Sequence, residues 1–385
     1  MPNGVDQMIY FDNSATTVCL PEAADAARKY MIEGFFNPAA AYASAVQTER
    51  DVSAARANVA SALGAEPSEL IFTSCGTESN NTAIYGSLKA MRGKGRIVVS
   101  AVEHPSVYEA AVDLKEQGYD VVFAPVDGAG RVRLDELAGL LTADVRLVSV
   151  MHVNNESGAV NDVDAVYALM KRNSPDALLH VDGVQAFLKE SPVKCDMYSV
   201  SGHKLHAPKG VGALYIKKGT HIKPLLPGGG QESNLRSGTT NVPGIMAFSA
   251  AVSDFRSNRE FYRESMMAVK RRLWEDLQRI RDVRLNGPEI EEGAAHILNV
   301  SFMGVRGEVL LNALSEKGLY VSTGSACAAH NRGRNRVLNA MGITGERQDG
   351  AIRFSFSHFN TPAEADRAAQ LIEEQVAVLR RFRRR

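Results

Sequence analysis

The stretch "YSVSGHKLHAPKGVG", residues 198–212, ends an apolar strand abruptly at a lysine. Residues 197–201 favour a β-strand, and the glycines and the proline that follow favour an exposed loop. Lys204 comes directly after the strand, close to Ser201 and His203. Solubility does not require this arrangement. A lysine at the carboxyl end of a strand can instead form an imine with an aldehyde, a common form of covalent catalysis.

Short apolar segments alternate with helical ones on both sides of this stretch, from about residue 70 to residue 216. The intervening segments Pro105–Gln117, Leu134–Leu141 and Val163–Lys171 have the apolar spacing of helices. Strands that are apolar throughout and separated by helices predict a largely parallel sheet covered on both faces, in an α/β fold. The expected strands are ELIFTS (69–74), GRIVVSA (95–101), YDVVFAPV (119–126), DVRLVSVMHV (144–153), ALLHVDGV (177–184), CDMYSVSG (195–202) and GVGALYIKK (210–218).

The pattern changes after the segment "LPGGGQESNLRSGTTNVPG", residues 226–244. A long helical stretch follows, at about Ile245–Ile280, and then two strands, HILNVSFM (296–303) and AIRFSF (351–356), alternate with helices Glu308–Lys317 and Pro362–Arg380. We therefore predict two domains, since 385 residues exceed one ordinary core. The large domain spans residues 14–255, and a smaller α+β domain spans 256–385, with residues 1–13 packed on it.

The overall composition narrows the class of protein. A hydrophobic fraction of 45%, a charged fraction of 23% and a net charge of zero give no reason to expect affinity for nucleic acid or membranes. No signal sequence and no apolar run of about 18 residues occurs, so we expect a cytoplasmic protein. The four cysteines lie far apart without a CxxC pair, and no metal site is predicted. The terminal "RRFRRR" is read as a solvated helix end or a docking patch for an acidic partner.

Further polar residues follow other expected strands. Asp182 in "HVDGVQ" ends an apolar strand, where a carboxylate needs a partner such as a ring N–H⁺, or else caps the next helix. His104 follows another strand in "SAVEHPSV". Gly76 and Thr77 in "TSCGTESNN" lie between a strand and a helix, where they form either a small anion site or a plain helix cap. No GxxxxGK[ST] or GxGxxG motif is present.

These residues together match the needs of pyridoxal 5′-phosphate. That cofactor uses a lysine for its aldehyde, an acid for its pyridine nitrogen, a cup for its phosphate and a flat group stacked on its ring. Ligands of parallel sheets bind at the carboxyl ends of the strands, and Lys204, Asp182 and His104 are expected at that edge. Each element alone is weak evidence, but four of them on successive strand ends are not.

The chain resembles the cysteine desulfurases of the NifS/IscS type, in the class V aminotransferase group of pyridoxal-phosphate enzymes. The resemblance extends from "YFDNSATT" at residue 10 to "NTPAEAD" at residue 360. It implies the fold-type I architecture, a large domain with a mostly parallel sheet and a smaller α+β domain. The motifs that carry it are FTSCGTESNN, EHPSV, VMHVNNESGAV, HVDGVQA, SGHKLHAPKGVGALY, RSGTTNVPG, STGSAC and AIRFSF.

The resemblance also implies roles for individual residues. Lys204 would hold the cofactor as a Schiff base, Asp182 would pair with the pyridine nitrogen, and His104 would stack on the ring and move protons. Arg353 would bind the substrate carboxylate, a task that suits a bidentate donor. The phosphate cup would consist of Gly76, Thr77, Ser201 and His203, and Gln185 and Asn155 would contact the ring oxygen or the substrate.

Two further residues distinguish the desulfurases within this group. Cys327 in "STGSACAAHNRGRN" matches the cysteine that accepts sulfur, and His330, Arg332, Arg334 and Arg336 are close enough in sequence to favour its thiolate. Thr239 in "RSGT" matches a residue that completes the phosphate cup of the partner subunit, so the resemblance implies a homodimer. The implied reaction converts L-cysteine to L-alanine and passes the sulfur through a Cys327 persulfide to an acceptor protein, such as an iron–sulfur scaffold or a tRNA-thiolation protein.

The sequence departs from the family at several positions, and other functions stay open. The segment "NPAAAYASA" lacks the family's histidine, and Cys75 stands where the family usually has glycine; we expect Cys75 to pack rather than react. The alternatives are a selenocysteine lyase, a class V aminotransferase and a non-catalytic scaffold partner. Cys327 argues against the aminotransferase, and the presence of Lys204 and Asp182 argues against the scaffold.

Overall fold

The structure is a computed structural model that describes residues 8–324 and 335–383. Within them, the largest sheet has seven strands in the order β2-β8-β7-β6-β5-β3-β4. Strands β7, β6, β5, β3 and β4 run parallel, and β8 is antiparallel to both of its neighbours. The strands are β2 (Leu70–Thr73), β3 (Arg96–Ser100), β4 (Asp120–Ala124), β5 (Val145–Met151), β6 (Leu178–Asp182), β7 (Met197–Ser201) and β8 (Gly212–Ile216).

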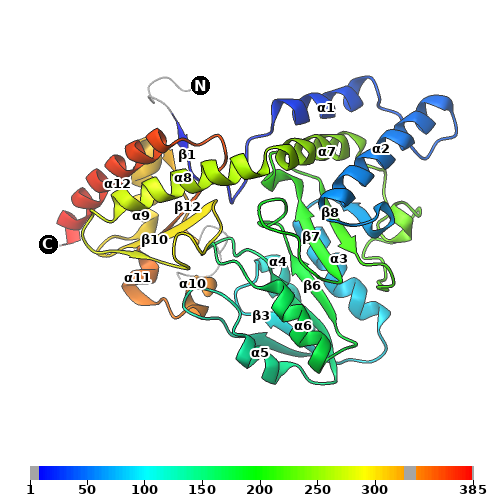
Figure 1. The fold of residues 1–385 in the computed structure, drawn as a ribbon, viewed down its shortest axis with the longest axis horizontal. Helices are drawn as coiled ribbons and strands as arrows, with labels where there is room; N and C mark the ends of the chain where they lie inside the picture. Colours follow the sequence, from blue (N-terminus) through cyan, green and yellow to red (C-terminus); the bar gives the residue numbers. More distant parts are fainter. Residues whose placement is uncertain (1–7, 325–334, 384–385) are drawn as a thin grey trace.

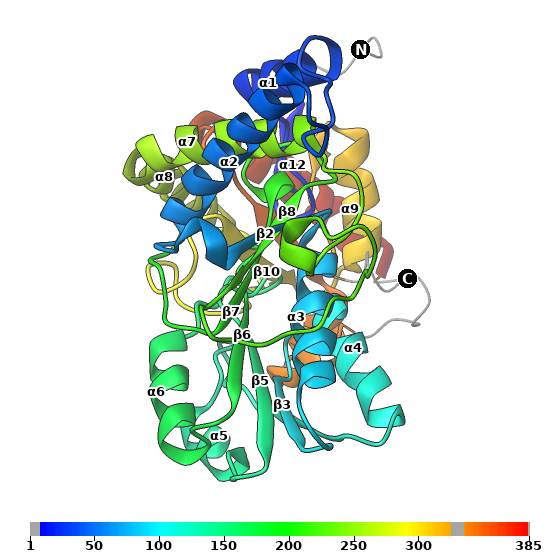
Figure 2. The ribbon, with the colours of Figure 1, turned by 90° about the vertical axis from the view of Figure 1, so that its right-hand side faces the viewer.

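Helices cover both faces of this sheet (Figure 2). On one face lie α3 (Gly76–Ala90) and α4 (Pro105–Glu116), which share an apolar cluster with Ile71, Ile97 and Leu147 of the strands. On the other face lie α5 (Leu134–Leu140) and α6 (Val163–Asn173). Because both faces are buried, the strands need apolar residues at almost every position. The predicted α/β fold with a mostly parallel sheet is confirmed.

The second part of the fold is a small antiparallel sheet with helices against it (Figure 1). Its strands lie in the order β12-β10-β9, and β1 pairs with β11 in a separate parallel pair. The elements are β1 (Ile9–Tyr10), β9 (Val283–Leu285), β10 (Ile297–Phe302), β11 (Leu319–Tyr320), β12 (Ala351–Ser355), α9 (Gly307–Glu316), α10 (Arg336–Ala340), α11 (Gly345–Asp349) and α12 (Pro362–Arg383).

Helices α7 (Val242–Ser257) and α8 (Arg259–Leu277) follow one another from the large sheet to the small one (Figure 1). Helices α1 (Pro21–Ile32) and α2 (Ala43–Ala62) pack against α7, and α12 packs against α8. The single long helix expected at 245–280 is in fact two, because the helical path is interrupted at Asn258. The side chain of Asn258 donates to the carbonyl oxygen of Asp254 at 3.0 Å. The backbone N–H of Asn258 donates to the same oxygen at 3.1 Å, but the dihedral angles of Asn258 are not helical, so α7 ends and α8 begins there.

The division of the chain at residue 255 stays a prediction, and that position falls inside α7. The described residues also contain three short 3₁₀ segments: η1 (Pro67–Glu69), η2 (Gly202–Lys204) and η3 (Glu232–Asn234). In the described part of the chain, no helix is long and apolar enough to cross a membrane.

Candidate active site

A cavity of about 360 Å³ lies at the carboxyl ends of the parallel strands. Its walls come from the ends of β2, β3, β5, β6 and β7, together with residues 12–15 and the strand β12. The parallel topology makes these ends coincide, although the residues are far apart in sequence. Ten of the residues predicted for the site line it: Gly76, Thr77, His104, Asn155, Asp182, Gln185, Ser201, His203, Lys204 and Arg353.

Lys204 enters this cavity from the 3₁₀ turn that follows β7. Its ammonium group donates hydrogen bonds to the carbonyl oxygens of Ser14 and Ala15, the latter at 2.7 Å. The loop of residues 12–17 therefore crosses the strand end, and it is also held by Thr17, which donates to the carbonyl oxygen of His203 at 2.9 Å. These contacts hold the amine at the cavity wall.

Asp182 is the last residue of β6 and is buried. Its Oδ2 accepts from the Asn80 amide at 2.8 Å, and its Oδ1 accepts from the backbone N–H of Val184 at 3.0 Å. Two donors hold the carboxylate in one orientation. The helix-cap alternative is wrong, because no helix of the described chain lies between β6 and β7, and the Val184 bond is a local turn contact.

His104 caps the N-terminus of α4 through its ring. Its Nδ1 accepts from the backbone N–H of Ser106 at 3.1 Å, so the proton of the neutral ring resides on Nε2. Burial lowers the pKa of His104, and the Asp182 carboxylate only partly opposes this shift. The ring is therefore neutral near pH 7 and lines the same cavity as Lys204 and Asp182.

A third part of the cavity is suited to an anion. The N-terminus of α3 begins at Gly76, and a Cβ there would lie 2.6 Å from Cγ2 of Val184, so the backbone N–H groups come close to the cavity only because this residue is glycine. The hydroxyl of Ser201 is buried with no hydrogen-bond partner among the described residues. Helix N–H groups and an unused buried hydroxyl are what a phosphate group requires.

Arg353 lies opposite, in the middle of β12, and its side chain is buried. One guanidinium nitrogen contacts Oδ1 of Asp12 at 2.9 Å, and the other contacts Oε1 of Glu156 at 3.1 Å. Arg353 is therefore not a surface arginine. Its positive charge is shared between two carboxylates at the edge of the cavity.

Several residues of the site were not predicted from the sequence. Asp12 and Glu156 bind Arg353, Asn80 orients Asp182, and Ser14 accepts from both Lys204 and Gln185. The signal for Asn80 and Glu156 was available, because they belong to the quoted motifs FTSCGTESNN and VMHVNNESGAV. The same holds for Asp12 and Ser14, which belong to the quoted motif YFDNSATT and lie just after the two-residue strand β1.

Of the predicted site residues that the structure describes, only Thr239 does not line this cavity. Thr239 is exposed on the segment that leaves β8, away from the cavity of its own chain. That segment is held by two ion pairs, Arg56 with Glu232 at 2.6 Å and Arg236 with Glu78 at 2.9 Å. Cys327, with His330, Arg332 and Arg334, lies outside the described residues.

Comparison with known proteins agrees with this geometry. The sequence profile of the aminotransferase class-V family matches residues 9–368. The chain is a member of the aminotransferase class-V family. It is 38% identical over 380 residues to a cysteine desulfurase of Trichormus azollae, covering 97% of this chain and 94% of the relative. It is 39% identical over 380 residues to the cysteine desulfurase IscS of Methanosarcina thermophila, with coverage of 97% and 93%.

Solved structures of this class-V family show the same fold. A NifS-like protein superimposes with a TM-score of 0.91 at 36% identity, covering 97% of this chain and all 100% of the other. A structure described as SspA in complex with cysteine gives a TM-score of 0.80 at 29% identity, with coverage of 92% and 100%. The predicted membership of the NifS/IscS-type cysteine desulfurases, and with it the fold-type I architecture, is confirmed.

The class-V family uses pyridoxal phosphate, and the residues of this cavity fit that group. The buried Ser201 hydroxyl and the buried Oε1 of Gln185 have no hydrogen-bond partner among the described residues. Both atoms face a cavity that also holds a lysine amine, a carboxylate and a helix N-terminus. If these two residues only packed in the protein interior, each of the two buried oxygen atoms would lack a hydrogen bond, at a cost of about 1–3 kcal/mol each.

Proposed function

We propose that the protein is a pyridoxal-phosphate-dependent cysteine desulfurase that converts L-cysteine to L-alanine and transfers the sulfur to an acceptor. The observation that carries the proposal is the meeting of Lys204, Asp182, His104 and Arg353 around one cavity. The cysteine desulfurases of similar length and the structure described as SspA in complex with cysteine support it.

The residues would divide the work as follows. Lys204 would hold the cofactor aldehyde and move the proton of the substrate Cα, and Asp182 would keep the pyridine nitrogen protonated. Once bound, the cofactor supplies a ring that accepts the electrons released at Cα. His104 would stack on that ring with its neutral imidazole, and Asn155 and Gln185 would contact the ring oxygen or the substrate.

The phosphate would be held by Gly76 and Thr77 at the N-terminus of α3, by Ser201 and by His203. His203 is suited to this as a hydrogen-bond donor rather than as a charge. Burial and the nearby Lys204 lower the pKa of His203 to about 3, so its ring is neutral at physiological pH.

The substrate carboxylate would bind Arg353 in competition with Asp12. The Asp12 side chain is more exposed than that of Glu156, at 21% against 10%, so it is the easier carboxylate to displace. Glu156 would stay in place and orient the guanidinium. A substrate without an α-carboxylate would then leave the Arg353–Asp12 pair intact and bind weakly.

We propose Cys327 as the nucleophile that takes the sulfur, and Thr239 as a phosphate ligand of the partner subunit in a homodimer. The sulfur would pass to an acceptor protein in the cytoplasm, for iron–sulfur cluster assembly or tRNA thiolation. The described residues on both sides of residues 325–334 support the first role, because Thr323 and Gly324 line the cavity and Arg336 bonds to the carbonyl oxygens of Ala101 and Glu103, just before His104.

The test is to measure alanine and sulfide formed from L-cysteine, with and without a reductant, by the protein saturated with pyridoxal phosphate. We expect equal amounts of alanine and reductant-released sulfide. Alanine formed only from L-selenocysteine would favour a selenocysteine lyase. Amino-group transfer to a 2-oxo acid without sulfide release would favour an aminotransferase, and inactivity in all three assays would overturn the proposal.

A further inference from the structure

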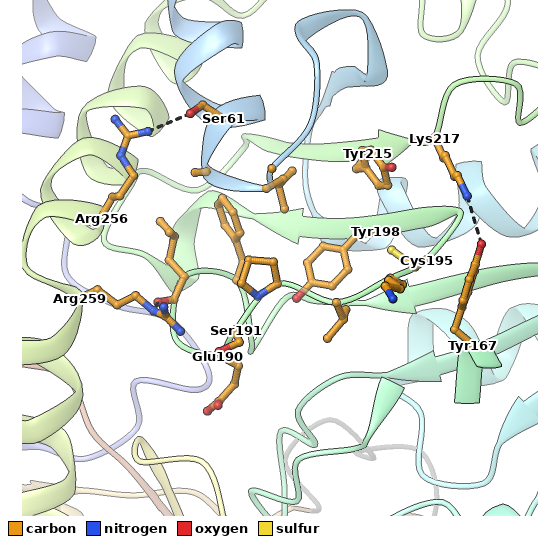
Figure 3. A pocket seen from close by; sticks show the side chains of 18 residues that line it. Ser61, Tyr167, Glu190, Ser191, Cys195, Tyr198, Tyr215, Lys217, Arg256 and Arg259 are labelled. Carbon is orange, nitrogen blue, oxygen red and sulfur yellow. Dashed lines mark hydrogen bonds between the residues drawn. The ribbon is translucent and has the colours of Figure 1, made fainter. Parts of the chain in front are cut away.

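A second cavity, of about 440 Å³, lies between the end of α2, the connection from β6 to β7, and the junction of α7 with α8 (Figure 3). None of the residues that line it lines the candidate active site. Its volume falls within the range of roughly 300–1,000 Å³ that is typical of small-molecule sites. The proposed desulfurase reaction does not use it.

The floor of this second cavity is aromatic. Tyr198 of β7 and Tyr215 of β8 are opposite each other in the strand register, so their rings lie on the same face of the sheet. Phe187 and Pro192 add apolar walls. Tyr198 is fixed in place, because its hydroxyl lies 3.1 Å from Nδ1 of His152 and its ring lies directly against Gly183. Flat faces of this kind stack on planar rings.

The ends of the second cavity are cationic. Figure 3 shows Arg256 and Arg259 at one end and Lys217, beside Tyr167, at the other. Arg259 donates from Nε to the carbonyl oxygen of Leu188 at 2.9 Å, and Arg256 reaches the Ser61 hydroxyl at 3.4 Å. Neither arginine forms an ion pair with a carboxylate in the described part of the chain, so both guanidinium groups keep donors available for an anion.

The acidic side chain of the lining does not cancel this charge. Four cations, Lys194, Lys217, Arg256 and Arg259, line the second cavity together with Glu190. Burial raises the pKa of Glu190, and Arg263 and Arg259 only partly oppose the shift. Glu190 therefore holds its negative charge less firmly than an exposed glutamate, and the cavity favours anions.

We propose that this cavity binds a planar aromatic ring that carries one anionic group, a carboxylate or a phosphate. The ring would lie over Tyr198 and Tyr215, and the anion would lie between Arg256 and Arg259. Such an occupant would contact the segment 182–190, which supplies Asp182 and Gln185 to the candidate active site and Phe187, Leu188 and Glu190 to the second cavity.

The test is calorimetric titration of the protein saturated with pyridoxal phosphate and freed of excess cofactor, so that the phosphate cup of the active site is occupied. Two probes distinguish the sources of the anion: adenosine 5′-monophosphate for a phosphate and indole-3-acetate for a carboxylate. We expect at least one of them to bind with one site per chain. Adenosine, which lacks the anion, and inorganic phosphate, which lacks the ring, should each bind at least 10-fold more weakly.

Variants locate the site. Arg259→Gln should weaken binding at least 10-fold, whereas Arg271→Gln, at an exposed arginine on the same helix outside the lining, should leave it unchanged. If Arg259→Gln fails to fold, Ser61→Trp gives the same test, since Ser61 is exposed at the rim and a large ring there blocks the opening. Binding of neither probe, or equal binding by wild type and Ser61→Trp, would overturn the proposal.

Discussion

The side-chain amide of Asn80 donates a hydrogen bond of 2.8 Å to Oδ2 of Asp182, from one helix to the end of the central strand. The same amide donates to the hydroxyl of Ser106 at 2.9 Å, and that hydroxyl lies 2.8 Å from Nδ1 of His104. The acid and the imidazole of the candidate site are therefore oriented by one asparagine. A change at Asn80 reaches both groups without contact with the substrate.

We expect Asn80→Ala to weaken the binding of pyridoxal phosphate. The substitution removes a donor to a buried carboxylate, a bond worth roughly 1.5–3 kcal/mol, and so predicts a loss of roughly 10- to 100-fold in affinity. Fluorescence titration of the apoprotein measures this. Asn81→Ala is the matched control, because the Asn81 amide bonds to the carbonyl oxygens of Thr77 and Ser106 but not to Asp182. Equal losses in both variants would refute the role of Asn80.

Lys204→Ala should abolish the covalent attachment of the cofactor. The purified protein should lack the yellow absorption band, and borohydride reduction should leave no labelled peptide. Lys209→Ala is the control, because Lys209 lies on the same loop but is exposed and outside the cavity. Loss of the band in Lys209→Ala with retention in Lys204→Ala would show that the lysine was assigned wrongly.

The predicted homodimer is tested by complementation between two inactive chains. Thr239→Glu places a negative charge where the partner's phosphate would lie, and Lys204→Ala removes the amine. In a mixed dimer one of the two sites has both an intact Lys204 and an intact Thr239, so random mixing should restore about a quarter of the wild-type activity.

Sedimentation at assay concentration supplies the second measurement for the dimer. A protein that sediments as a fully active monomer, or a mixture that stays inactive although the chains exchange, would be incompatible with a shared site. Glu232→Gln provides a graded variant, because it weakens the Arg56–Glu232 ion pair that holds the segment of Thr239. It should lower cofactor affinity less than Thr239→Glu does.

The sequence was informative where one chemical requirement acts on neighbouring residues. Strands buried on both faces must be apolar, so β3, β5, β6 and β7 were visible as apolar runs, and the parallel topology then placed Lys204, Asp182 and His104 at one edge. The three residues could be assigned together because the carboxyl ends of parallel strands lie at the same edge of the sheet, and each of these residues lies at or just after such an end.

Other features depend on contacts that local patterns do not record. The two carboxylates on Arg353 come from residues 12 and 156, and nothing near either position indicates that they meet. The break between α7 and α8 lies at a single residue, Asn258, whose backbone dihedral angles are not helical. The second cavity could not be predicted from the sequence, because its shape depends on the path of the backbone. Tyr198 can lie against residue 183 only because that residue is glycine, since a Cβ there would be 1.9 Å from the ring.

Stability should fall as the pH is lowered below about 6.5. Seven histidines in the described residues have a lowered pKa because of burial: His152, His180 and His358, each to about 4; His203 and His206, each to about 3; and His104 and His296. Between pH 6.5 and those values the unfolded chain binds protons that the folded chain does not. A fully buried group such as His180 then contributes a loss of up to about 1.4 kcal/mol per pH unit.

Three buried carboxyl groups act in the opposite direction. Burial raises the pKa of Glu103, Glu156 and Glu190, so the folded chain binds their protons first and gains stability as the pH falls. The histidines outnumber them, so the melting temperature should decrease from pH 6.5 to pH 5. His358→Phe should make this decrease less steep by removing one titrating group. A melting temperature that is constant over this range contradicts the prediction.

Cys327→Ala separates a desulfurase from its relatives within the class-V family. The thiol acts only on a substrate sulfur that the cofactor has already activated, so the variant should keep the Lys204-linked absorption band and should still show a spectral change when L-cysteine is added. Alanine formation should fall by roughly 100-fold or more, because the nucleophile of the bond-breaking step is absent.

Cys75→Ala is the matched control, since Cys75 lines the cavity beside the proposed phosphate cup and is expected only to pack. Equal rates of alanine release by wild type and Cys327→Ala would show that sulfur leaves without a protein nucleophile, and a lyase would then be the better description. Loss of activity in Cys75→Ala alone would move the sulfur-accepting role to that residue.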